Sequence, residues 1–404
     1  MSAGFDIFRF AFAAVFTGLH AGLMFGLFRE WRHDNRLAGL SKKTGQRGDS
    51  GRPGTVSVVV PVRNEEAHLP DLLESLARQD YPEREFIFID DGSTDKSPDL
   101  LKNFAAPRPD ARIITLAENP GPNRKQYALT RGIGAARGGL LLFTDADCEV
   151  PPGWISAMAA RMADEGIALT IGPVFKRPDP GQPGGNFFRQ YQCFDHAVRY
   201  MYLAASTGLG AAGGGFGNNL AVRREALDRI GGYANIPPSP TEDAALVSMI
   251  RARGRSRAAT GCGRAPGAGM AVHAACGRDL WVLTKNERTW KALVNQTLRW
   301  NNGGLFSPSL GTRLNFGFLV VTISMGILAI PALPFAGGLW PLPAAVLLAM
   351  TMNTIATLRL FGPALPRGGL GYIVQIVFTP AYFTFLTILG FCGIKADWKG
   401  RPAG

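Results

Sequence analysis

Acidic side chains gather at two places in the first half of the chain. Asp90-Asp91-Gly92-Ser93 follows one apolar run, and Asp145-Ala146-Asp147 follows another, Leu-Leu-Leu-Phe-Thr. Carboxylates are hard oxygen ligands, which Mg²⁺ or Mn²⁺ takes together with diphosphate oxygens. One Asp of the second pair could reach a ribose and the other a metal ion. Asp is also common in turns and helix caps, so Asp-x-Asp alone is weak evidence.

A third acidic group, Thr241-Glu242-Asp243, follows the Pro-rich segment 237–240. As a helix start, it would place Thr241 at the cap and the acids near the positive end of the helix dipole. The same position would allow Asp243 to act as a general base toward an acceptor hydroxyl. The two interpretations are compatible.

Further along lies Gln296-Thr297-Leu298-Arg299-Trp300, at the end of an amphipathic stretch, 289–300. Trp and Arg often anchor helices at a membrane interface. Alternatively, Trp300 forms a platform for an acceptor and Arg299 lies near a leaving diphosphate.

The elements that must position these residues are short apolar runs alternating with helical patterns from 55 to 275. We predict strands at 55–60, 85–90, 112–116 and 140–144, and helices at 65–78 and 93–104. This βαβα order predicts an α/β fold with a mostly parallel sheet covered on both faces. Ligands of such sheets bind beyond the carboxyl ends of the strands, where both acidic clusters fall.

Four apolar stretches are long enough to cross a bilayer: 5–28, 314–335, 339–360 and 369–393. The first precedes a basic run and lacks a small-residue cleavage site, which favours a retained anchor with its basic flank in the cytoplasm. Four spans would put the C-terminus outside, yet the tail is basic, so one stretch could be interfacial or re-entrant. We predict an anchor (1–30), a basic linker (31–54), a catalytic domain (55–285), an interfacial helix (286–304), a transmembrane region (305–394) and a basic tail (395–404).

Composition excludes several classes of protein. The net charge is +12, but the bases that follow the first apolar stretch favour anionic lipid over nucleic acid as their partner. The five cysteines form no Cys-x-x-Cys pair, so neither a zinc ribbon nor a disulfide framework is indicated. No Gly-x-Gly-x-x-Gly follows the first strand, which disfavours a dinucleotide-binding oxidoreductase.

Taken together, these motifs resemble the membrane-bound branch of family 2 glycosyltransferases, which have the GT-A fold. The resemblance covers about residues 55–304, and the order and spacing of its motifs make it specific. It rests on Val-Pro-Val-Arg-Asn-Glu (60–65), Asp-Asp-Gly-Ser-Thr-Asp (90–95), Asn-Arg-Lys-Gln-Tyr-Ala-Leu (123–129), Phe-Thr-Asp-Ala-Asp-Cys (143–148), Gly-Asn-Asn-Leu-Ala-Val-Arg-Arg (217–224), Gly-Gly-Tyr (231–233), Thr-Glu-Asp (241–243) and Gln-x-x-Arg-Trp (296–300).

The resemblance implies a role for each matching residue. The nucleotide part of the donor would be held by Pro61, Arg63, Glu65, Asp91, Lys125 and Asp145. Asp147, with Asp145, would bind Mg²⁺ or Mn²⁺; Asp243, beside Glu242, would be the catalytic base; and Gln296, Arg299 and Trp300 would bind at the acceptor and the diphosphate. The chain departs from the usual pattern at Pro-Gly-Pro-Asn-Arg (120–124), before Lys125. His273 could be a further metal ligand, or a structural residue as most lone histidines are.

These residues predict inverting, metal-dependent transfer of a sugar from a nucleotide-sugar, expected to be a UDP-sugar, to a lipid hydroxyl at the cytoplasmic face of the membrane. A processive polysaccharide synthase is the alternative, and an inactive sugar-nucleotide-binding membrane protein is a weaker one. A synthase that secretes its polymer needs a polar path through its helices, yet Arg359 is the one ionisable residue inside the three C-terminal apolar stretches. A lipid acceptor is therefore favoured.

Overall fold

The computed structural model describes residues 3–44, 54–118, 123–177, 185–237, 239, 241–259, 270–305, 310–366, 369–392, 394, 396–398 and 401–403. The chain forms two compact units. The sheet unit contains Arg29–Phe175 and Gly210–Lys285, and the helical unit contains Met1–Phe28, Lys176–Leu209 and Asn286–Gly404. We describe each by itself.

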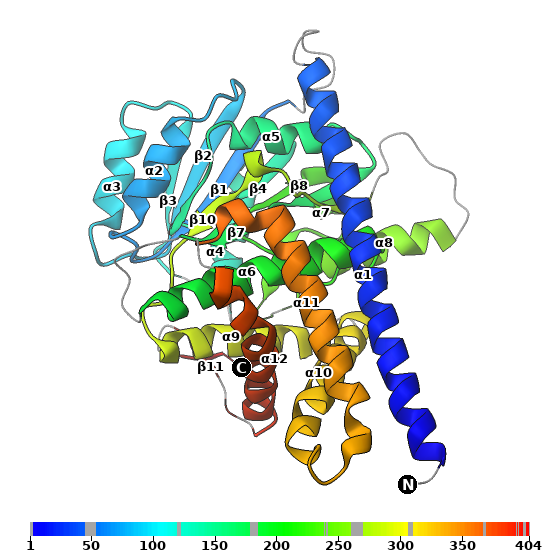
Figure 1. Ribbon diagram of the computed structural model, residues 1–404. Helices are drawn as coiled ribbons and strands as arrows, with labels where there is room; N and C mark the ends of the chain where they lie inside the picture. The colour runs from blue at the N-terminus through cyan, green and yellow to red at the C-terminus, as the bar shows by residue number, and fades with distance from the viewer. Residues whose placement is uncertain are drawn as a thin grey trace. The chain divides into compact units, whose positions relative to one another are not determined.

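A seven-stranded sheet is the centre of the sheet unit, with strand order β3-β2-β1-β4-β8-β6-β9 (Figure 1). Its strands are β1 (Val56–Val62), β2 (Arg84–Asp90), β3 (Ala111–Thr115), β4 (Leu140–Phe143), β6 (Ile167–Ile171), β8 (Leu220–Arg223) and β9 (Ala271–Ala274). β1 pairs in parallel with β2 and β4, and β8 runs antiparallel to both of its neighbours. The predicted mostly parallel α/β fold is confirmed. Because the chain runs outward from β1 to β3 and returns to β4 on the other side, the sheet reverses its order between β1 and β4.

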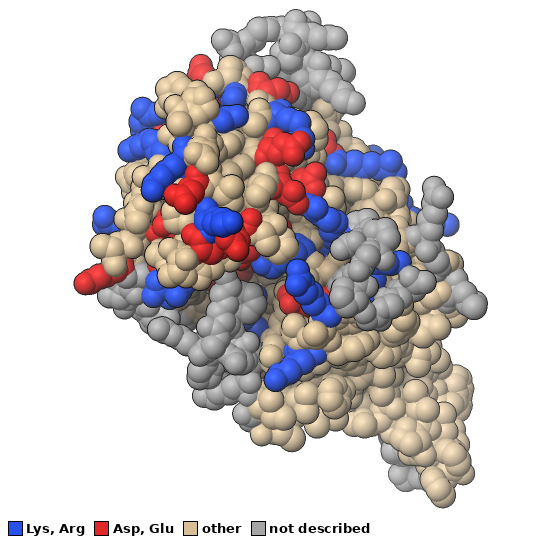
Figure 2. All heavy atoms as spheres, turned by 90° about the vertical axis from the view of Figure 1, so that its left-hand side faces the viewer, with Lys and Arg blue, Asp and Glu red and all other residues tan. Residues whose placement is uncertain are grey.

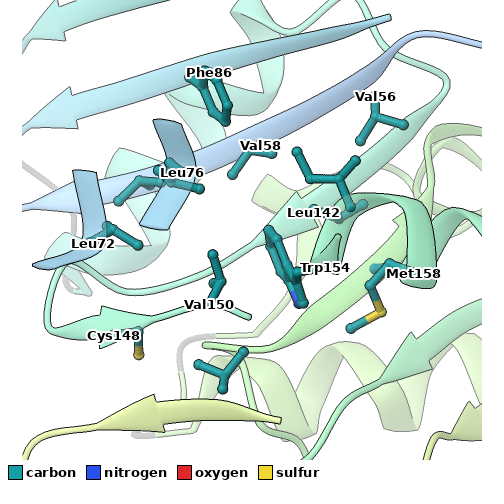
Figure 3. Packing of buried hydrophobic residues seen from close by; sticks show 14 of the residues in the cluster. Val56, Val58, Leu72, Leu76, Phe86, Leu142, Cys148, Val150, Trp154 and Met158 are labelled. Atoms are coloured by element: carbon teal, nitrogen blue, oxygen red, sulfur yellow. The ribbon is translucent and has the colours of Figure 1, made fainter. Parts of the chain in front are cut away.

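Helices surround this sheet: α2 (Leu69–Ala77), α3 (Ser97–Ala105), α4 (Arg124–Ala135), α5 (Trp154–Arg161), α7 (Arg224–Arg229) and α8 (Glu242–Ala259). Proline at the first turn starts α2 and α3, where its missing N–H is not needed. Side chains of α2 and α5, among them Leu76 and Trp154, meet the Val-rich β1 and its neighbours in one buried cluster (Figure 3). A second, smaller sheet has the strand order β5 (Cys148–Glu149), β10 (Val282–Thr284) and β7 (Val174–Lys176). In the sequence, β5 is the strand that follows β4.

Helix α1 (Ala3–Thr44) is one continuous helix, longer than expected. The prediction of a linker from residue 31 was wrong as far as Thr44, and residues 45–53 lie outside the described residues. Its second half has no proline and contains several Arg, Lys and Leu residues, which favour helix. Glu30, Asp34 and Leu37 of this half are buried, so packing within the sheet unit stabilises it.

The helical unit contains the first part of α1 and α6 (Gly185–Gly208), α9 (Trp290–Leu305), α10 (Leu310–Ala329), α11 (Pro341–Phe361) and α12 (Gly369–Phe391), followed by the hairpin β11 (Ala396–Trp398) and β12 (Arg401–Ala403). Of the described helices, three are long and apolar enough to cross a membrane: Asp6–Gly39, Gly337–Ala364 and Gly371–Phe391. The apolar helix Phe316–Ala332 is shorter, which suits the expectation that one apolar stretch is not a full span. The lower end of the face that Figure 2 shows is almost entirely free of Lys, Arg, Asp and Glu.

His20, an unusual residue for a membrane segment, has polar partners within the helical unit. Its Nε2 lies 3.2 Å from the hydroxyl of Tyr202, which also accepts a hydrogen bond from the amide of Asn353. Polar contacts of this kind join helices where no water is available. His20 therefore links α1 to α6 and α11.

Candidate active site

The loops after β1 and β2 brace each other through side chains. Asn64 donates its N–H to Ser93 and accepts from the N–H of Thr94, at 3.1 and 2.8 Å. Glu66 in turn donates its N–H to Asp95 at 2.9 Å. These bonds replace the first turns expected for the two helices, so α2 begins at Leu69 and α3 at Ser97. The bracing fixes the loops that carry Glu65 and Asp91.

Pro61 and Arg63 lie where β1 and β4 part. The β1–β4 ladder ends at Val59, whereas the β1–β2 ladder continues through Pro61 to Val62. Proline has no N–H to donate, so it is tolerated on the side where pairing has ended. Arg63 points to the neighbouring strand end, with its Nη1 3.5 Å from Asp91 Oδ2.

Asp91 is held by a second arginine, which the sequence analysis did not assign. Arg124 grips the carboxylate with two hydrogen bonds, Nε to Oδ2 and Nη2 to Oδ1, each 2.9 Å long. Arg124 belongs to the unusual Pro-Gly-Pro-Asn-Arg segment, whose residues 120–122 lie outside the described residues. The bidentate pair fixes the Asp91 carboxylate in one plane.

Lys125 connects the end of β4 to the start of α8. Its ammonium lies 2.7 Å from Asp145 Oδ1 and 3.6 Å from Glu242 Oε1. Burial alone favours the neutral amine, but Asp145 and Glu242 outweigh it and raise the pKa of Lys125. Burial also raises the pKa of Glu242, while the Lys125 charge opposes this shift. The structure therefore brings three predicted site residues, Lys125, Asp145 and Glu242, together around one half-buried positive charge.

Asp243, on the first turn of α8, is oriented by backbone N–H groups. Its Oδ2 accepts a hydrogen bond from Gly217 and its Oδ1 from Ala244, both 2.8 Å long. A Cβ added to Gly215 would meet the backbone of Asp243 at 2.7 Å, and one on Gly217 would lie 3.1 Å from Asp243 Cβ. The Gly-rich run 208–217 thus lets the backbone approach the carboxylate closely.

Asp147 and Glu65 share a lysine, Lys285, that the sequence analysis missed. Its ammonium lies 3.0 Å from Glu65 Oε2 and 3.4 Å from Asp147 Oδ2. Burial lowers the pKa of Lys285, but Asp147 and Glu65 more than offset this and raise it above its ordinary value. Lys285 directly follows β10, whose Thr284 is paired with Cys148. The pairing of β10 with β5 therefore brings a basic residue beside Asp147.

The oxygen ligands at the end of β4 fit a divalent cation that arrives with a diphosphate. Asp145 and Asp147 are partly exposed and already lie against positive charges. In the part of the chain that the structure describes, no group of three or more His, Cys, Asp or Glu could hold a metal by itself. Mg²⁺ is commonly bound by one or two carboxylates plus substrate phosphates and water, so two aspartates are sufficient.

The Gln-x-x-Arg-Trp motif lies on α9 of the helical unit. Gln296 donates from Nε2 to Glu287 Oε1 at 2.7 Å, and the N–H of Glu287 is bound by Gln192 of α6 at 2.8 Å. Gln296 is buried, whereas Arg299 and Trp300 are half-buried. The glutamine therefore holds the start of the motif in place, and the last two side chains remain partly accessible.

Trp300 rests on a polar face of α6, which the sequence did not reveal. The Arg199 guanidinium lies 5.3 Å from the centre of the Trp300 ring and is bonded to Asp195 at 2.7 Å. The His196 ring lies 5.4 Å from the same indole. Burial, with Lys176 and Arg199 nearby, lowers the pKa of His196, so this ring is neutral at physiological pH. These contacts fix the orientation of the indole from one side.

His273 has a structural environment. Its Nδ1 lies 2.7 Å from Glu30 and its Nε2 3.1 Å from Asp34, both on α1. Asp34 also accepts a 3.0 Å bond from Arg161. A metal ligand needs an unprotonated ring nitrogen with a free lone pair, and both nitrogens face carboxylates. The structural alternative for His273 is the one that these contacts support.

The stability contributed by His273 is expected to fall as the pH rises. Burial disfavours the charged ring, but the bonds to Asp34 and Glu30 outweigh it and raise the pKa of His273 above 6.5. A group with a raised pKa in the folded state adds stability below its unfolded pKa, and loses it as pH rises through the folded pKa. Between about pH 5 and pH 9, the melting temperature of His273→Gln should therefore lie below that of wild type, and the difference should be largest at the acidic end. A difference in melting temperature that does not change with pH would contradict a charged His273. His68→Gln is the matched control.

Comparisons with known proteins show related sequences and a similar fold. Residues 57–231 match the family described as Glycosyl transferase family 2. The chain is 25% identical over 300 residues to the beta-monoglucosyldiacylglycerol synthase of Nostoc sp., which covers 69% of this chain and 57% of that protein. It is 39% identical over 114 residues to the undecaprenyl-phosphate 4-deoxy-4-formamido-L-arabinose transferase of Shewanella sediminis, covering 28% of this chain and 34% of the relative.

A solved structure has a similar fold. It is the mannosyltransferase PcManGT from Pyrobaculum calidifontis in complex with GDP-Man and Mn²⁺, with a TM-score of 0.52 and 19% identity, covering 94% of this chain and 98% of that chain. At this identity the similarity concerns the fold. The chain spans little more than half of the length of the Nostoc relative, 57%.

Proposed function

We propose, from the match of residues 57–231 to Glycosyl transferase family 2, that the chain transfers a sugar from a nucleotide-sugar, a UDP-sugar, to a hydroxyl of a membrane lipid with inversion at the anomeric carbon. The observation that carries the proposal is Lys125, whose ammonium joins Asp145 at the end of β4 to the Glu242-Asp243 start of α8. It links a residue expected to bind the donor to Glu242, the neighbour of the residue expected to activate the acceptor.

The donor's nucleotide is assigned to the strand ends where the sheet order reverses. Glu65 and Asp91 lie on the two braced loops, and Asp91 is fixed by Arg124. Carboxylates that are already fixed accept hydrogen bonds from ribose hydroxyls or base N–H groups with little further loss of conformational entropy. Pro61 and Arg63 line the same edge.

Asp243 is assigned as the general base. Two backbone N–H groups orient its carboxylate, which can take the proton of the acceptor hydroxyl as that oxygen attacks the anomeric carbon. The bond to the donor's diphosphate breaks on the opposite face, so the configuration inverts in a single displacement. Arg299 is assigned to the negative charge that grows on the departing diphosphate.

Asp147, with Asp145, would hold Mg²⁺ or Mn²⁺ when the donor is bound. A divalent cation there would supply charge neutralisation for the departing diphosphate. Mn²⁺ is present in the mannosyltransferase of similar fold, which makes it the first ion to test.

The lipid acceptor is supported by the helical unit and by the relatives' names. Three described helices could cross a membrane, and the relatives are named for a glucosyldiacylglycerol and for undecaprenyl phosphate. The basic residues of α1 that follow its apolar part, including Arg29, Arg32 and Arg36, favour the cytoplasmic side of the cell membrane. Nucleotide-sugars are available there.

Trp300→Ala tests the assignment of the acceptor. We expect transfer of labelled sugar into the lipid phase of proteoliposomes to fall by about tenfold or more, because aromatic platforms contribute on the order of 1–3 kcal/mol to binding of a flat ligand face. Hydrolysis of the donor without acceptor should change much less. Trp340→Ala, which removes an exposed indole of the same unit, is the matched control. Equal losses of hydrolysis and transfer would remove Trp300 from the acceptor's contacts.

A further inference from the structure

Lys285 occupies a position that its strand fixes. β10 and β5 pair antiparallel with Thr284 opposite Cys148, so Lys285, which follows β10, lies beside Asp147, which precedes β5. The side-chain contacts agree, with the Lys285 ammonium within 3.4 Å of Asp147 and 3.0 Å of Glu65. The position follows from backbone register as well as from side-chain orientation.

The ammonium of Lys285 and a divalent cation would compete for one carboxylate. Both are positive, and both would lie within a few ångströms of Asp147 Oδ2. Like charges at such separation repel strongly in a partly buried site. Lys125 cannot take this role, because it lies against Asp145 and Glu242. A diphosphate would change the balance, since its oxygens offer both a new partner for the lysine and further ligands for the metal.

We propose that Lys285 makes metal binding depend on the nucleotide. It is the resident counter-ion of Asp147 and Glu65, and it keeps the affinity for a divalent cation low until a diphosphate accepts its charge. This inference rests on the proposed function. To that function it adds the role of Lys285 and an order of binding, in which the nucleotide precedes the metal. Lys285 is a positioning residue, because it acts through Asp147.

The test is Mn²⁺ binding to the full chain in detergent, measured by electron paramagnetic resonance with and without UDP. Wild type should bind Mn²⁺ weakly alone and much more tightly with UDP, after subtraction of Mn²⁺ chelated by free UDP. Lys285→Met should tighten Mn²⁺ binding without UDP by about tenfold or more, because a neighbouring positive charge is removed. Lys285→Arg keeps the charge and should behave as wild type. Lys102→Met, which removes an exposed lysine of α3, is the matched control.

The outcomes separate this inference from the proposed function. Unchanged Mn²⁺ affinity of Lys285→Met without UDP, with wild type still showing UDP-dependent binding, overturns the role of Lys285 alone. If wild type binds neither UDP nor Mn²⁺, the donor assignment fails and this inference fails with it. Should Lys285→Met not fold, Lys285→Gln gives the same neutral charge with a polar end, and the same tightening is expected.

Discussion

Asp243→Asn is expected to lower kcat for sugar transfer by about 10²–10⁴-fold, the usual cost of losing a general base. The amide has almost the same shape as the carboxylate and can keep one of the two bonds from Gly217 and Ala244, so the start of α8 should stay in place. It cannot take a proton from the acceptor. Because Lys125 and Asp145 are untouched, the dissociation constant of UDP should remain within a few-fold of wild type.

Steady-state transfer kinetics and UDP titration by calorimetry check this expectation on the same preparations. Asp228→Asn, on the exposed face of α7, is the control, because it removes one carboxylate charge away from the proposed site. A parallel collapse of UDP affinity and turnover would reassign Asp243 to nucleotide binding.

Asp147→Asn is expected to reduce turnover by about two to four orders of magnitude, comparable to other losses of electrostatic stabilisation of a leaving group. An amide is a neutral and poorer ligand for a hard cation than a carboxylate. The variant should therefore need much more Mn²⁺ for half-maximal activity. Folding should be preserved, because Asp147 is partly exposed and its partner Lys285 retains Glu65.

Activity as a function of Mn²⁺ concentration, with and without EDTA, measures this effect. Asp99→Asn, an exposed acid of α3, serves as the comparison. Full activity of Asp147→Asn in EDTA would rule out a metal role for this residue.

The sheet could be predicted from the sequence because its strands are local signals. Apolar runs at 55–60, 85–90, 112–116 and 140–144 correspond to β1, β2, β3 and β4 within two residues. The loops that follow these strands were harder to predict, since Asn64 bonds to Ser93 and Glu66 bonds to Asp95 where helices were expected to begin. Such bonds depend on which strands become neighbours.

The acidic residues that we assign to the site could be picked out from the sequence because they follow apolar runs or a Pro-rich segment, in an order that resembles family 2 glycosyltransferases. Their basic partners were not. Lys285 is 138 positions from Asp147, and only the pairing of β10 with β5 brings them together. Similarly, nothing near Trp300 in the sequence indicates His196 or Arg199, which reach it from α6. The end of α1 was mistaken for a linker because its burial depends on His273 and Arg161, far along the chain.

The most direct test of the account is the structure of the product. Purified enzyme in liposomes should be supplied with a UDP-α-sugar and Mn²⁺, and the lipid extract analysed by proton nuclear magnetic resonance. The account predicts a β-linked sugar on a membrane lipid, because a single displacement inverts the anomeric carbon and the acceptor is a lipid hydroxyl. An α-linked glycolipid would contradict the mechanism, and a water-soluble polymer with no sugar in the lipid extract would contradict the acceptor.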